Sequence, residues 1–230
     1  MPDLVVPATP DERPRRRADR TRRAVAAAVA VAREHGLRVD EPVVLNDRFS
    51  VQVHLAPAPV VAGISTWTAE LRPDITDWLA RKVAVTDHLE AVGAPVVGNS
   101  PELPPGPHER DRLAMTFTIW APPDADRTPG AADCVAMLPD LHTALATFSG
   151  ELRWIDFEDV CRGPLGYDLA LLRWMNPTAG DGWAEPEQLA LCSDLRAVYL
   201  ALCMFAFRDA FGDDPEWDGY IRWFVSRISS

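Results

Sequence analysis

Apolar and polar positions follow two different periods along the chain. Between residues 42 and 65, two short apolar runs, at 43–45 and 60–65, flank a segment in which apolar Val51, Val53 and Leu55 alternate with polar residues. This period of two predicts half-buried strands, and the prolines and polar residues between the apolar runs predict an antiparallel meander. The same alternation predicts another strand over 113–120. His54 lies on the polar side of its strand, so we expect it at the surface.

Helical spacing marks most of the remaining chain. Residues 11–35 are rich in alanine and arginine and end before Gly36, and residues 74–92 carry an apolar stripe that ends before Gly93. Both glycines suit the left-handed residue that follows a helix. In the second half, the pattern predicts one strand, at residues 152–157. It also predicts four helices, at residues 131–148, 166–175, 186–211 and 215–228. A strand-rich half followed by a helical half predicts an α+β fold.

Two further expectations concern residues inside the predicted helices. Pro139 should kink or restart the helix that contains it, because proline lacks a backbone N–H. The large side chains of four tryptophans should pack the helices against one another rather than bind a ligand. These tryptophans are Trp174, Trp183, Trp217 and Trp223.

The charge balance excludes several classes of function. The chain carries 34 acidic and 23 basic side chains, a formal net charge of −11, which disfavours binding to the negative backbone of nucleic acids. Its only lysine, Lys82, follows no suitable glycine, which excludes a phosphate-binding loop of the P-loop type. No run of eighteen apolar residues exists, so we expect no membrane partner.

The cysteines point to a reducing compartment. They show neither CxxC spacing nor a nearby histidine cluster, which argues against zinc and for buried thiols. They are Cys134, Cys161, Cys192 and Cys203. The start of the chain has no signal-peptide pattern, and we expect a cytoplasmic protein.

A cluster of acids follows the predicted strand at 152–157. Asp156, Glu158 and Asp159 lie within four positions of one another. Carboxylates at the end of a strand can hold Mg²⁺, which prefers oxygen ligands. A polar loop that caps the following segment is the alternative interpretation.

Several stretches in order along the chain resemble the aminoglycoside phosphotransferase and choline kinase-like family, in particular its actinobacterial branch. They are Val53–Ala62, Pro104–Arg110, Trp154–Asp159, Gly163-Pro164 and Tyr167–Ala170. The resemblance implies a two-lobed, protein-kinase-like fold, with an N-terminal lobe over residues 1–121 and a shortened helical lobe over 122–230. It also implies ATP and Mg²⁺ as co-substrates and a small-molecule hydroxyl as the phosphate acceptor.

The same resemblance assigns individual roles. Asp156 would hold the metal, and Asp168 would brace the loops around the site. Ile119, Trp120 and Ala121 would form the hinge against the adenine, and Ser50 would also contact the nucleotide.

Two departures from the family pattern affect catalysis. Such kinases use a His-Gly-Asp loop with an asparagine five residues on, in which the aspartate orients the acceptor and the asparagine holds metal. This sequence has no His-Gly-Asp, and the segments that should flank the loop abut near residues 148–152, which indicates an internal deletion. In the smaller lobe, Gly63 stands where a cation should grip the phosphates. Lys82 stands where a helix glutamate should pair with that cation, and it is a candidate for a displaced cation.

We therefore interpret the chain as a pseudoenzyme, inactive or strongly impaired in phosphoryl transfer. Three alternatives stay open. The chain could be a residual enzyme that uses another carboxylate as base. It could be a non-catalytic nucleotide or metabolite binder. It could also be an interaction protein in which a second copy covers the surface exposed by the shortened lobe.

Overall fold

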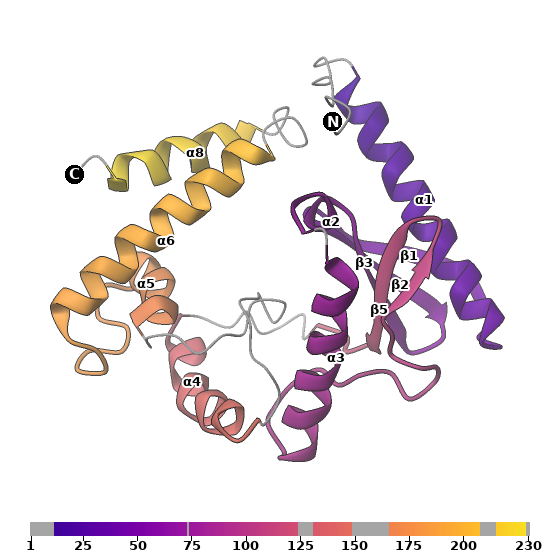
Figure 1. Ribbon diagram of the computed structural model, residues 1–230, viewed down its shortest axis with the longest axis horizontal. Coiled ribbons are helices and arrows are strands. Elements are labelled where there is room, and N and C mark those ends of the chain that lie inside the picture. Colours follow the sequence, from indigo (N-terminus) through magenta and orange to yellow (C-terminus); the bar gives the residue numbers. More distant parts are fainter. Residues whose placement is uncertain (1–11, 73, 124–130, 149–165, 208–214, 229–230) are drawn as a thin grey trace. The chain divides into compact units, whose positions relative to one another are not determined.

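The computed structural model describes residues 12–72, 74–123, 131–148, 166–207 and 215–228, which form two compact units. One unit contains a β-sheet and the helices next to it in sequence, and the other consists of helices (Figure 1). Helices and an antiparallel sheet both occur, so the predicted α+β class is confirmed.

The sheet has five antiparallel strands in the order β1-β2-β3-β5-β4. The strands are β1 (Val39–Asp47), β2 (Ser50–Pro57), β3 (Val60–Ser65), β4 (His108–Arg110) and β5 (Leu113–Ile119). The first three form the predicted meander. Two helices, α2 (Trp67–Leu71) and α3 (Ile75–Ala91), connect β3 to β4. The sequence pattern predicted α3 but neither α2 nor β4.

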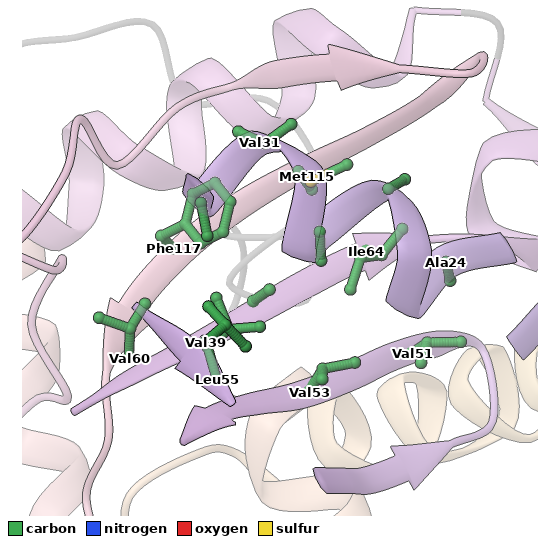
Figure 2. Packing of buried hydrophobic residues seen from close by; sticks show 14 of the residues in the cluster. Ala24, Val31, Val39, Val51, Val53, Leu55, Val60, Ile64, Met115 and Phe117 are labelled. Atoms are coloured by element: carbon green, nitrogen blue, oxygen red, sulfur yellow. The ribbon is translucent and has the colours of Figure 1, made fainter. Parts of the chain in front are cut away.

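Helix α1 (Arg13–Glu34) provides the apolar cover for one face of the sheet. Ala24, Ala28 and Val31 belong to the same buried cluster as the side chains at every second position of β2, β3 and β5 (Figure 2). The small alanines allow the helix backbone to approach the strands closely. Because side chains alternate across a strand, the intervening residues of β2, β3 and β5 lie on the opposite face.

The helical unit contains α5 (Gly166–Met175), α6 (Pro186–Ala206) and α8 (Pro215–Ile228), and α6 packs against both of the others. Trp217 is 2% exposed, and its Nε1 donates a hydrogen bond to a backbone carbonyl of α6 at 3.1 Å. Trp174 Nε1 donates to Ser193 Oγ at 2.9 Å. These two tryptophans pack as predicted. Trp183 is 39% exposed, so the prediction was wrong for that residue.

Helix α4 (Ala131–Ala146) continues through Pro139 and does not restart there. A proline within a helix costs one backbone hydrogen bond and crowds the carbonyl four residues earlier, and the helix tolerates both at Pro139. At the C-terminal end of α4, His88 Nε2 of α3 donates to the Ala144 carbonyl at 3.0 Å and lies 3.0 Å from Thr147 Oγ1. This contact attaches the end of α4 to α3.

One helical stretch in the described part of the chain, Pro186–Phe205, has the length and composition to cross a bilayer. Only 17% of its most apolar stretch is buried. Core helices of globular proteins pass the same test, so the expectations of no membrane partner and of a cytoplasmic location stay predictions.

Candidate nucleotide-binding site

The face of the sheet opposite α1 carries a small group of polar residues around Gly63. Strand pairing places Gln52 of β2 and Thr116 of β5 on either side of Gly63. A Cβ atom added to Gly63 would lie 3.1 Å from Gln52 Oε1 and 3.2 Å from Gln52 Nε2. The Gln52 carboxamide therefore fills the space next to Gly63, where the resemblance implies a cation.

Ser50 belongs to the same group. Gln52 Nε2 donates a hydrogen bond to Ser50 Oγ at 3.3 Å, which fixes the carboxamide along β2. The structure thus brings Ser50, a predicted nucleotide contact, together with Gly63. Thr116, at 1% exposure, is the buried member of the group, and no described residue forms a hydrogen bond with its Oγ1.

The predicted hinge follows directly from β5. The Trp120 backbone N–H donates to the Pro59 carbonyl at 2.8 Å, and the Ile119 N–H donates to the Gly98 carbonyl at 3.0 Å. These bonds hold the start of the hinge on both sides. Val60 pairs with Ile119, so the hinge lies three residues along β3 from Gly63, or about 10 Å at the rise of a strand.

His54 is half-buried and does not simply face solvent as predicted. Its ring stacks on the Trp120 ring with centroids 4.4 Å apart and planes 15° apart. His54 Nε2 lies 3.1 Å from the Ala58 carbonyl and must carry the proton that this oxygen accepts. The ring pair forms a fixed aromatic surface beside the hinge.

The other predicted site residues do not join this group. Lys82 lies on α3, half-exposed, and forms no hydrogen bond or ion pair with any residue that the structure describes. Asp168 lies exposed in the first turn of α5, which belongs to the helical unit. Asp156, Glu158 and Asp159 fall outside the described residues. Among the described ranges, no three His, Cys, Asp or Glu side chains form a group that could hold a metal ion.

A cavity of about 420 Å³ lies within the helical unit, between α5 and the start of α6. Arg173 and Asp181 line it and form an ion pair at 2.9 Å, and Ser193 adds a hydroxyl. Because the two charges neutralise each other, this cavity offers no net charge for a phosphate.

The group around Gly63 can form hydrogen bonds and present an aromatic surface, but Ser50, Gln52 and Gly63 supply no positive charge. The family resemblance indicated Ser50, Gly63 and the hinge. The sequence pattern gave no signal for Gln52, because a polar residue at an alternating position looks like an ordinary solvent-facing one.

Comparisons with known proteins add no assignment. No family model matches the chain, and no curated protein or solved structure matches it either.

Proposed function

We propose that this chain is a degenerate member of the aminoglycoside phosphotransferase and choline kinase-like family, with a kinase-like fold. In this proposal its sheet unit binds a nucleotide, and its phosphoryl transfer to a small-molecule hydroxyl is lost or strongly impaired. The observation that carries the proposal is the strand pairing around Gly63. It supports a site in which the hinge and the phosphate-gripping position lie on neighbouring strands about 10 Å apart, a distance that ATP can span from base to phosphates.

The order of elements also supports the proposal. A helix, three strands, two helices and two further strands precede the hinge, and the resemblance likewise implies an N-terminal lobe of a helix, antiparallel strands, a helix and a hinge strand. At the position of the cation, the neutral carboxamide of Gln52 lies beside Gly63. A carboxamide can donate to a phosphate oxygen but cannot neutralise its charge.

The expected loss of rate follows from the missing groups. A positioned general base contributes a factor of about 10² to 10⁴. A cation on the transferred phosphoryl contributes about 10³ to 10⁵ in the arginine-finger case. These factors need not multiply, because the groups act as a unit. The loss of the general base alone, or of the cation alone, brings the rate of phosphoryl transfer far below ordinary kinase rates.

A thermal-shift titration with ATP, with and without Mg²⁺, tests the binding part. We expect ATP to raise the melting temperature of the wild-type protein, since a ligand that binds only the folded state stabilises it by mass action. Asp156→Ala should remove the part of the shift that depends on Mg²⁺. Trp120→Ala should reduce the shift with or without the metal. No shift with ATP at concentrations up to millimolar would overturn the proposed nucleotide site.

A parallel assay tests the catalytic part. ADP release in the presence of choline, simple alcohols and aminoglycosides should stay at background. Turnover at ordinary kinase rates, about 1 to 100 per second, would overturn the assignment as a pseudoenzyme.

A further inference from the structure

Helix α6 carries a second apolar face that no described residue of the helical unit covers. Five side chains on it are between 40% and 63% exposed. They are Leu191, Leu195, Val198, Leu202 and Phe205. On the other side of the helix, Cys192, Ala197 and Ala201 are buried. A helix that is apolar on both sides is typical of one that has a second packing partner.

The spacing of the exposed stripe points to another helix as that partner. Its members follow one another at intervals of four, three, four and three residues. This is the a/d pattern of a coiled-coil seam, in which each side chain inserts between four residues of a facing helix. The stripe itself contains no charged residue.

We propose that this stripe, the residues Leu191, Leu195, Val198, Leu202 and Phe205 of α6, joins two copies of the chain as an antiparallel helix pair. A two-fold axis between Arg196 and Ala197 places Leu191 opposite Leu202 of the second copy, and Leu195 opposite its Val198. Four of the five stripe residues thus face one another across the axis, as a symmetric dimer requires. The inference does not depend on the nucleotide site.

The charge distribution along α6 favours the antiparallel arrangement. The acids near the helix, Glu185, Glu187 and Asp194, all precede its midpoint, and residues 197–207 carry no charge. A parallel pair would gather both sets of acids at one end. In the antiparallel pair the two Glu187 residues lie about 28 Å apart along the axis, at 1.5 Å per residue.

The same distribution argues against a lipid surface as the partner. Helices that bind anionic membranes carry several basic residues on their polar face. The only basic residue of α6 is Arg196, and its guanidinium carbon lies 4.6 Å from the centre of the Tyr167 ring. The chain as a whole has a net charge of −11, which repels anionic headgroups.

The size of the stripe sets the expected strength. A whole apolar side chain buries roughly 100 Å², so five half-exposed ones supply roughly 250 Å² per copy. That is below the ~800 Å² per partner of a standard interface, so the dimer should dissociate in the micromolar range or above.

Sedimentation velocity on the full chain, from about 5 to 500 µM, tests the proposal because this range brackets such dissociation constants. We expect a concentration-dependent dimer in the wild type and at least a tenfold weaker association in Leu195→Glu, which places a charge in the seam. Leu171→Glu is the matched control, since Leu171 is an exposed leucine of α5 outside the stripe. It should associate as the wild type does, and circular dichroism should show that both variants are folded.

Charge pairs test the antiparallel register. The double variant Leu191→Glu/Leu202→Lys should still dimerise, because each glutamate then meets a lysine of the second copy. Leu191→Glu/Leu202→Glu should not. A wild-type chain that stays monomeric throughout this concentration range would overturn the proposal. Co-sedimentation with anionic vesicles that is lost in Leu195→Glu would overturn it in favour of a lipid surface.

Discussion

In the proposed nucleotide site, replacing Gly63 by lysine should raise the affinity for the phosphates of ATP. Gly63 lies in strand β3, and its backbone has no conformation that excludes a side chain. The new Cβ would meet only the end of the Gln52 side chain, at 3.1 Å from Oε1 and 3.2 Å from Nε2. That side chain can rotate away, at the cost of its 3.3 Å hydrogen bond to Ser50, which contributes about 0.5–1.5 kcal/mol.

Methionine at the same position provides the matched control. Gly63→Met displaces Gln52 in the same way and has nearly the same length but no charge. The difference between the two variants therefore isolates the charged hydrogen bond, which is worth about 1.5–3 kcal/mol. At 1.4 kcal/mol per tenfold change in affinity, Gly63→Lys should bind ATP about 10 to 150 times more tightly than Gly63→Met.

Isothermal titration calorimetry with ATP and Mg²⁺ measures this ratio. Adenosine, which lacks phosphates, should bind both variants equally, and added salt should reduce only the advantage of the lysine. Equal ATP affinities in two folded variants would refute the reasoning that Gly63 stands at the phosphate-gripping position.

Three further predictions concern the helical unit. In a urea titration, Gly180→Ala should lower the free energy of unfolding by about 2–4 kcal/mol, because φ at Gly180 is +63° and the new Cβ would lie 2.6 Å from Leu169 Cδ2. Gly182→Ala is the control: φ is +81° but nothing lies within 4 Å of the new Cβ, so the same titration should show a loss of only about 1–2 kcal/mol. Burial raises the pKa of the Cys192 thiol. The buried neutral thiol therefore makes its whole contribution to the free energy of unfolding below the ordinary thiol pKa of about 8.5, and this contribution is lost as the pH rises through the raised pKa. Unfolding at pH 7 to 10 should therefore show a steeper decline in the wild type than in Cys192→Ala, and parallel curves would contradict this. Trp217→Ala should cost about 3–5 kcal/mol, measured by thermal or urea unfolding, and a loss below 1 kcal/mol would show that this tryptophan does not pack the core as described.

The elements that the sequence predicted are those whose apolar pattern extends over several repeats. In strand β2 buried and half-buried side chains alternate, because α1 covers one of its faces, so the period of two reflects a real difference in burial. Strands β3 and β5 are buried at most positions on both faces, and their apolar runs are correspondingly more continuous. The two missed elements are short. Strand β4 has three residues and α2 has five, which is too few for either period to show.

The candidate site was predictable only in part, and the reason lies in the pairing of distant residues. Ser50, Gly63 and the hinge came from the family resemblance, one residue at a time. Contacts such as the stacking of His54 on Trp120 depend on strand register and chain reversal, which no local period encodes. The half-buried state of His54 follows from that stacking.

Gln52 changes the meaning of the glycine at position 63. A glycine alone would leave a gap that a displaced cation such as Lys82 could enter. The carboxamide of Gln52 already occupies that space and is tied to Ser50, so a cation reaching in from elsewhere would have to displace it. In the proposed site the phosphates then meet a neutral donor, which adds little electrostatic energy. Most of the affinity for a nucleotide therefore has to come from the base and ribose, at the end of the site formed by Trp120 and the hinge.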